Sequence, residues 1–131
     1  GATPSDVANP DTDVPLFRVA EAYLTRAEAN YRLGNSDALN DINTLRERAN
    51  AERLTSLSEM DILDEWAREF YFEGRRRSDL IRFGVFTSGS YVWDWKGGSY
   101  TGTGVQDFYK LYPIPANELA ANANMTQNPG Y

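Results

Sequence analysis

Two apolar stripes of helical period, separated by a glycine, constrain the fold of this chain most strongly. The first stripe runs from Leu16 to Leu33, and Gly34 follows as a stop signal. The second lies in DALNDINTLRERA, where Ser36 is placed to cap the helix start. The short link makes the two helices antiparallel neighbours. Their apolar residues are Leu16, Val19, Ala20, Tyr23, Leu24, Ala27 and Tyr31, then Ala38, Leu39, Ile42, Leu45 and Ala49.

A hairpin of this kind, with alanines where the backbones approach, is the unit of tetratricopeptide-like repeats. The sequence contains one evident copy, over residues 16–50. Because a lone hairpin cannot bury its apolar faces, we expect it to pack against the rest of this chain and against further sequence. The opening GATPSDVANPDTDVP lacks a basic-then-apolar leader, and we expect the chain to be part of a longer protein.

A second helix pair is predicted over residues 58–84. In LTSLSEMD, Ser58 is a cap and Asp61, three residues later, is its capping-box partner. The helix should continue to about Phe72, and Gly74 should break it. A short helix is expected from Arg75 to Phe83. The predicted buried residues of the pair are Ile62, Leu63, Trp66, Phe70, Leu80, Ile81 and Phe83.

The stretch EFYFEGRRRSDLIRFG places three consecutive arginines beside a ladder of glutamates. Residues 59–82 contain seven acids and five arginines, so the charges compensate locally. Glu73 with Arg77, and Arg75 with Asp79, are spaced for pairing within a helix. The alternative, an anion site, would need unpaired guanidiniums in a cleft. We predict a structural ion-pair core of Glu69, Glu73, Arg76, Arg77, Asp79 and Arg82.

The helical period ends at Val85, and residues 85–110 form a loop rich in glycine, serine and aromatic residues. Tyr91, Trp93 and Trp95 alternate with other residues, so an extended backbone would direct all three rings to one face. Such a face could stack on sugar rings, and these three residues are the candidate ligand-binding set. In the alternative, the rings anchor a long loop to the helices, and their burial distinguishes the two.

Residues 111–131 carry alternating prolines in YPIPANEL and end in Pro-Gly-Tyr. Proline favours an extended path followed by a turn, so we expect a tail that packs on the helices through Tyr112, Ile114 and Leu119. The predicted fold class is mainly α, with a tetratricopeptide-like hairpin, further helices, a long aromatic-rich loop and an extended C-terminal tail.

Composition limits the chemistry. The chain has no histidine and no cysteine, which removes the usual general base, the thiol nucleophile and the common zinc ligands. Carboxylate chemistry, a lysine base or an oxygen-ligated metal would remain, and we predict no cofactor and no metal site. The net charge of -6 argues against nucleic acid as a partner, because an acidic chain is repelled by phosphates.

The segments FRVAEAYLTRAEANYRLG, ALNDINTLRERA, REFYFEGRRRSDLIRFG, YPIPANEL and NMTQNPGY occur in this order. Together they resemble the C-terminal part of the SusD/RagB family of outer-membrane nutrient-binding lipoproteins, over about Leu16 to Tyr131. The resemblance implies a largely helical fold with four tetratricopeptide-like units. It also implies that residues 1–131 are the C-terminal part of one such domain, in which the matching Glu and Arg residues belong to the structural core.

The resemblance further implies a protein that binds glycans, or peptides in some members, at the cell surface and passes them to a TonB-dependent, SusC-like transporter. The lipid anchor would lie in the N-terminal part, which would supply the only membrane association. No catalysis is implied. Two alternatives remain open from the residues themselves: a tetratricopeptide-like scaffold for protein partners, and a glycosidase that uses two carboxylates.

Overall fold

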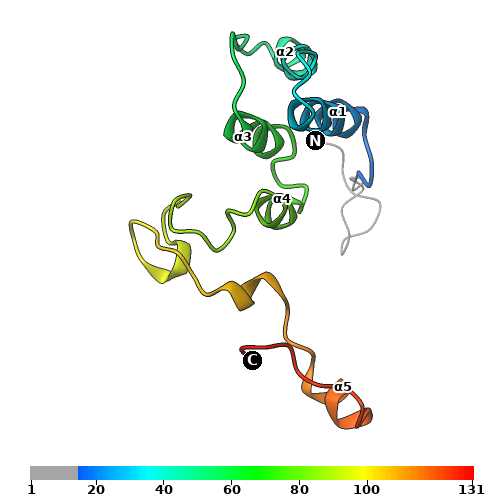
Figure 1. Ribbon diagram of the computed structural model, residues 1–131, viewed down its shortest axis with the longest axis vertical. Coiled ribbons are helices and arrows are strands. Elements are labelled where there is room, and N and C mark those ends of the chain that lie inside the picture. The colour runs from blue at the N-terminus through cyan, green and yellow to red at the C-terminus, as the bar shows by residue number, and fades with distance from the viewer. Residues whose placement is uncertain (1–14) are drawn as a thin grey trace, which may run out of the picture. The chain divides into compact units, whose positions relative to one another are not determined.

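The computed structural model describes residues 15–131, and residues 1–14, nearly all of the opening segment interpreted as the start of a fragment, lie outside the described residues. The described chain is mainly helical and contains no strand, which confirms the predicted fold class (Figure 1). It divides into two compact units, one ending at Arg76 and the other spanning Arg77–Tyr131.

Three helices build the first unit. The predicted hairpin is formed by α1 (Val19–Arg32) and α2 (Ala38–Arg48), and α3 (Glu59–Glu69) also packs on α1. The apolar stripes of these helices face inward, whereas Leu16 and Val19 are exposed because they lie at or before the first turn of α1. The buried apolar side chains of this unit are Ala20, Leu24, Ala27, Ala38, Ile42, Leu45, Ile62, Leu63, Trp66 and Phe70.

Of the helix ends predicted from capping residues and glycines, some agree with the structure and others do not. The capping box before α3 is confirmed, because the Ser58 hydroxyl accepts from the Asp61 amide while the Asp61 carboxylate accepts from the Ser58 amide. The predicted cap at Ser36 is wrong: α2 begins after Asp37 without a side-chain cap. The prediction that the third helix reaches Phe72 is also wrong, since α3 ends at Glu69 and Phe72 adopts a left-handed conformation with φ of 64°.

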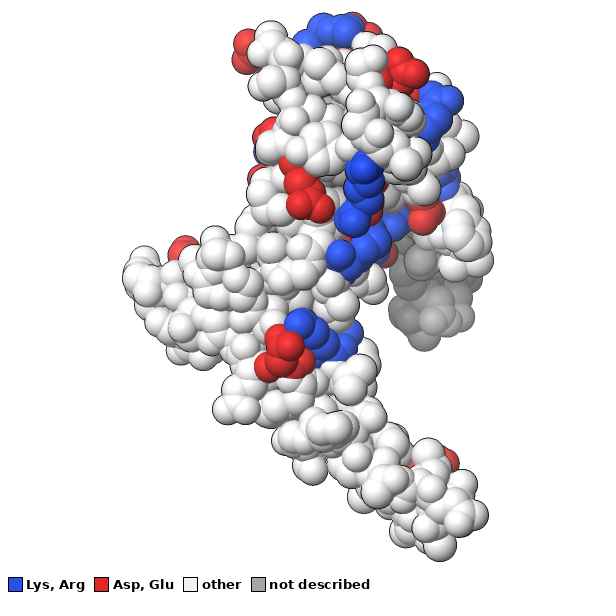
Figure 2. Space-filling view, viewed as in Figure 1, with Lys and Arg blue, Asp and Glu red and all other residues white. Residues whose placement is uncertain are grey.

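Ion pairs and hydrogen bonds connect the three helices. Arg26 of α1 binds the buried Asp41 carboxylate of α2 through Nε and Nη2, at 2.8 and 2.6 Å. Trp66 of α3 donates its indole N–H to Glu28 of α1, at 3.1 Å. Buried polar groups of this kind need such partners, so each contact helps to specify how the helices pair. In Figure 2, acidic and basic side chains accordingly lie next to one another over the helical part.

The glutamates of the predicted core are bound by arginines from other elements. Glu69 accepts hydrogen bonds from Arg18 and Arg48, and Glu73 accepts from Nε and Nη2 of Arg18. The Arg18 guanidinium also lies 4.0 Å from the centre of the Phe70 ring. This differs from the expected pairing of Glu73 with Arg77, because a tertiary contact supplies the glutamate with a different arginine.

The three consecutive arginines have different roles. Arg75 lies 4.0 Å from the centre of the Trp66 ring and pairs with Glu21 at 2.9 Å. Arg76, the first residue of α4 (Arg76–Arg82), donates to the Leu63 carbonyl at 2.9 Å. Both contacts stabilise the first unit. Arg77 makes its contacts within the second unit and is described with the cavity below.

The second unit contains α4 from Arg77 onward, two short 3₁₀ turns, η1 (Lys96–Gly98) and η2 (Asp107–Lys110), and α5 (Ala116–Ala121). Arg82 of α4 pairs with the buried Asp79 one turn earlier, at 2.8 Å. The sequence predicted neither the 3₁₀ turns nor α5, because they are shorter than the window in which a helical period can be recognised.

The C-terminal tail folds back on itself. The Gln127 side chain accepts from the Ile114 amide at 2.8 Å and donates to the Ile114 carbonyl at 3.0 Å. Asn128 donates to the Tyr112 carbonyl at 2.7 Å. The tail therefore packs through side-chain amides that bind backbone, and Tyr112, expected as an apolar anchor, has 70% of its surface exposed.

Candidate binding cavity

A cavity of about 830 Å³ lies within residues 77–131 and has the size typical of small-molecule sites. Its walls come from α4, from the start, middle and end of the aromatic loop, and from the C-terminal tail. Six of the residues that line it are aromatic: Phe86, Trp93, Trp95, Tyr109, Tyr112 and Tyr131. The cavity is therefore a largely apolar surface with a few polar groups at its wall.

Lys96 holds the aromatic loop in place. Its ammonium is buried and donates to the carbonyl oxygens of Val85, Ser88 and Tyr91. It also lies 4.8 Å from the centre of the Trp93 ring. Burial lowers the pKa of Lys96, while the three carbonyl oxygens favour its charged form. One side chain thus fixes the start of the loop beneath the indole of Trp93.

Two glycines allow the loop to close. Gly102 has a φ of 76°, and a side chain there would place its Cβ 2.4 Å from the Trp93 carbonyl oxygen. At Gly104 a Cβ would lie 2.9 Å from the Gly89 nitrogen. Next to this close approach, the Val105 amide donates to the Thr87 carbonyl at 2.9 Å. The glycine content of the loop therefore serves close backbone packing at these positions.

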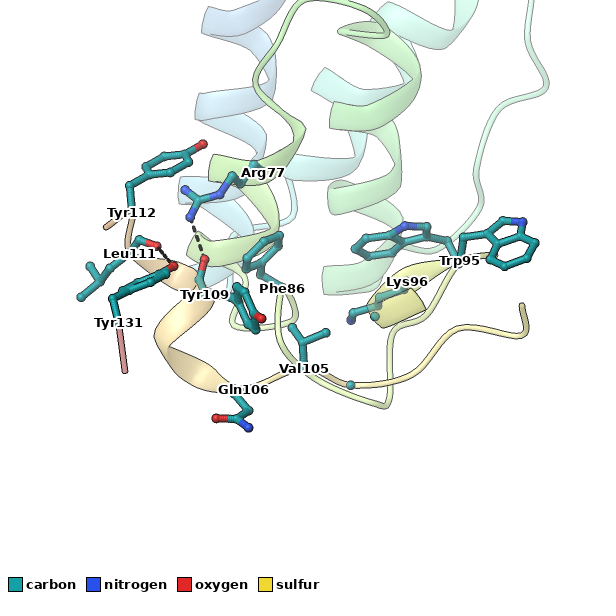
Figure 3. Close-up of a pocket in the computed structure, with 13 residues that line it drawn as sticks. Arg77, Phe86, Trp95, Lys96, Val105, Gln106, Tyr109, Leu111, Tyr112 and Tyr131 are labelled. Atoms are coloured by element: carbon teal, nitrogen blue, oxygen red, sulfur yellow. Dashed lines mark hydrogen bonds between the residues drawn. The ribbon is translucent and has the colours of Figure 1, made fainter. Parts of the chain in front are cut away.

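Tyr131 and Arg77 line another part of the wall. The Tyr131 hydroxyl donates to the Leu111 carbonyl at 2.8 Å, and its ring makes an edge contact with Phe108. Arg77 donates from Nη2 to the carbonyls of Tyr109 and Lys110, at 2.8 and 2.9 Å. Figure 3 shows Arg77 directed toward the Tyr109 carbonyl, with Tyr112 and Phe86 nearby.

The structure places the three predicted ligand-binding residues differently from one another. Trp93 and Trp95 both line the cavity, with 43% and 66% of their surfaces exposed. Tyr91 is half-buried and is not among the described residues that line it; it contributes the carbonyl oxygen that binds Lys96. The expected alternation stops at Trp95, whose φ of 69° belongs to a turn, so the rings do not share one strand face.

Sequence reasoning missed several cavity residues. Tyr109 lies in η2, at the end of the loop, whereas Tyr112 and Tyr131 belong to the tail, which folds back on itself. Arg77 was predicted to belong to the ion-pair core, because Glu73 lies four residues before it. The aromatic residues around the prolines of YPIP were the one signal that could have drawn attention to this wall.

Metal sites and membrane-spanning helices were also sought among the described residues. Across residues 15–131, no group of three or more acidic side chains is arranged to hold a metal ion. In the same range, no helix is both long enough and apolar enough to cross a bilayer.

The amino-acid sequence matches the sequence model of the SusD family over residues 2–131. The chain belongs to the SusD family. It is 58% identical, over its whole length, to the starch-binding protein SusD of Bacteroides thetaiotaomicron. It is also 35% identical, over 82% of its length, to a SusD-like protein of Formosa agariphila.

Solved structures agree with membership of the SusD family. The chain is similar to the surface glycan-binding protein A from Bacteroides thetaiotaomicron in complex with laminarihexaose, with a TM-score of 0.76 and 30% identity over 92% of this chain and 26% of that one. This chain spans 24% and 22% of the lengths of the two curated relatives. The similarity therefore concerns about a quarter of each relative.

Proposed function

We propose that this chain is part of a glycan-binding protein of the cell surface, and that Trp93 and Trp95 form a stacking surface in the cavity. The observation that carries the proposal is the partial exposure of both indoles at the wall of one cavity. Flat indoles bind the apolar C–H faces of pyranose rings, while nearby polar groups orient the hydroxyls. Two relatives of this chain, a starch-binding protein and a surface glycan-binding protein, support the same ligand class.

The whole protein acts in this proposal by binding alone. Hydrolysis of a glycosidic bond needs two suitably spaced carboxyl groups, and none of the residues that line the cavity is acidic. Bound glycan, starch-type in the first instance, is then passed to a TonB-dependent, SusC-like transporter in the outer membrane. The protein is held at the cell surface by a lipid anchor outside this chain.

Exposure of the indoles also weighs against the scaffold alternative. A purely tetratricopeptide-like interaction protein would be favoured if the aromatic loop were buried against the rest of the fold. Trp93 and Trp95 instead keep much of their surface accessible to a ligand.

The test is titration of the full-length protein with maltoheptaose by calorimetry, comparing wild type with a Trp93→Ala, Trp95→Ala variant. Removing two stacking rings should weaken binding by at least about tenfold, since an aromatic contact contributes on the order of 1 kcal/mol each. A Tyr71→Ala, Phe72→Ala variant is a matched control, because it removes two exposed rings that lie outside the cavity. Its affinity should equal that of wild type.

Equal affinity in the folded indole variant would refute the stacking surface. Release of reducing sugar from maltoheptaose, abolished by one carboxylate substitution, would refute the purely binding role. Transfer to a transporter is tested by isolating the protein from native outer membranes under mild detergent. Failure to recover a TonB-dependent transporter with it would contradict that part of the proposal.

A further inference from the structure

Four exposed apolar side chains lie on the helical unit, and none of them lines the cavity. Leu16 and Phe17 come just before α1, and Tyr71 and Phe72 come just after α3. Each of the four has between 75% and 91% of its surface exposed. The rings of Tyr71 and Phe72 contact each other edge to face, with their centroids 4.6 Å apart. These four residues form the Phe72 patch.

A small hollow connects the two ends of the Phe72 patch. It has a volume of about 110 Å³, and its lining includes Leu16 and Phe17 together with Phe70 and Glu73. The last two residues flank Tyr71 and Phe72 in the chain. A hollow of this size has room for a single side chain, and anchoring side chains at interfaces fill pockets of this kind.

The charged groups around the hollow already have partners. Arg18 pairs with Glu73 at 2.8 Å, and Arg75 pairs with Glu21 at 2.9 Å. All four of these residues belong to the lining of the hollow. Because the charges compensate one another and the rim is apolar, the surface suits an uncharged, apolar partner.

The backbone of Phe72 has a conformation that bulky side chains rarely adopt. Its φ of 64° lies in the left-handed region. Strained residues of this kind persist where the surrounding contacts compensate for the strain. The Phe72 ring is 91% exposed, and Tyr71 is its aromatic neighbour within the described residues. The side-chain contacts of residues 15–131 therefore leave most of the ring available to a partner that would supply the compensation.

The lengths of the relatives indicate where this partner comes from. This chain covers 24% and 22% of the two curated relatives, so more than three quarters of each relative lies outside the matched region. A tetratricopeptide-like hairpin buries its apolar faces against neighbouring elements of its own chain. A segment of the same polypeptide is also present at high effective concentration whenever the helical unit is folded, whereas a separate partner is not.

We propose that the Phe72 patch is the docking surface for an apolar segment of the same polypeptide that lies outside residues 1–131, and that Phe72 is its anchor. An apolar side chain of that segment fills the hollow, and the segment covers the Phe72 ring. Burial of the ring offsets the cost of the left-handed backbone. The inference is independent of the proposed function, because the patch and the cavity share no residue.

The first experiment measures the melting temperature of Phe72→Asn in the full-length protein. Asparagine tolerates the left-handed conformation, so the substitution relieves the strain while it removes the ring. A ring that is exposed in the whole protein would make this variant at least as stable as wild type. A ring that is buried by docking makes the loss of apolar burial dominate, and the melting temperature should fall by several degrees.

Two further variants complete this experiment. Leu33→Asn is the matched control, because Leu33 is also largely exposed but lies outside the patch; its melting temperature should change by about 1 °C or less. Phe72→Leu keeps an apolar side chain and the strain, and it should lose less stability than Phe72→Asn. A melting temperature of Phe72→Asn at or above that of wild type, or equal losses in Phe72→Asn and Leu33→Asn, overturns the inference.

Photo-crosslinking identifies what covers the patch. Benzoylphenylalanine is placed at position 72 of the full-length protein, the purified protein is irradiated, and the crosslinked peptides are identified by mass spectrometry. We expect a crosslink within one molecule to a peptide outside residues 1–131. Crosslinks confined to residues 1–131, a crosslinked pair of two copies, or no crosslink would each overturn the inference.

The binding control described above gives a further check. Tyr71→Ala, Phe72→Ala should melt at a lower temperature than wild type, because it removes two rings of the patch. Below that temperature its affinity for maltoheptaose should stay unchanged, since neither ring lines the cavity. An unchanged melting temperature in this variant would contradict docking at the patch, whatever the indole variant shows about glycan binding.

Discussion

Replacing Glu69 with glutamine should destabilise the helical unit, because this carboxylate joins two arginines from different elements. The Glu69 side chain is only 7% exposed and accepts from Arg18 and from Nη2 of Arg48. Breaking a buried ion pair costs about 3 to 5 kcal/mol, whereas an exposed pair contributes less than about 1 kcal/mol. Arg48 is 57% exposed, and Arg18 keeps its hydrogen bonds to Glu73. The cost of breaking each of the two ion pairs of Glu69 should therefore lie nearer to that of an exposed pair. We expect a loss of about 2 kcal/mol in the free energy of unfolding.

The effect should depend on pH with a definite sign. Burial raises the pKa of Glu69, but the hydrogen bonds from Arg48 and Arg18 outweigh it, and the pKa lies below its ordinary value of 4.5. A carboxylate with a lowered folded-state pKa contributes stability that is fully present above the unfolded-state pKa. That contribution is lost as the pH falls through the folded-state pKa. The difference between wild type and Glu69→Gln should therefore be largest near neutral pH and shrink below pH 4.5.

Urea unfolding of the full-length protein at pH 7, followed by circular dichroism, measures the difference. Glu47→Gln is the matched control, because Glu47 pairs with Arg53 while both side chains are more than half exposed, at 56% and 55%. It should cost less than about 0.5 kcal/mol. A loss at Glu69 no larger than that of the control, or a loss that persists unchanged below pH 4, would refute the reasoning.

Three other substitutions test separate parts of the structure. Ser58→Ala should lower the free energy of unfolding by about 1 kcal/mol, because it removes the cap of α3. This loss should become smaller in acid, because hydrogen bonds from Ser58 lower the pKa of Asp61, and urea unfolding at two pH values measures it. Gly130→Ala should destabilise the packed conformation of the C-terminus by about 1 to 3 kcal/mol, since φ is 95° and a Cβ would lie 2.5 Å from the Phe108 ring. Proteolysis at the C-terminus should become faster, and an unchanged rate would contradict this prediction. Lys96→Met should increase hydrogen exchange at the amides of residues 85–105, because three carbonyls lose their donor; unchanged protection would show that the loop is held by other contacts.

The sequence by itself determined the α1–α2 hairpin and the start of α3. Apolar residues at helical spacing on either side of Gly34 identify α1 and α2, and the capping pair Ser58 and Asp61 marks the first turn of α3. These features depend on residues a few positions apart, so they can be recognised without knowledge of the fold. The order of several weak motifs also identified the family, which the match over residues 2–131 confirms.

The tertiary structure decided which partner each charged side chain has and which rings share a cavity. Arg77 lies four residues after Glu73, yet it binds carbonyls more than thirty residues away, and Glu73 binds Arg18 from the other direction along the chain. Guanidinium groups bind carboxylates, carbonyls and aromatic rings alike, so local spacing cannot select among them. The cavity likewise needs the tail to fold back through Gln127, a contact between residues that no local period connects.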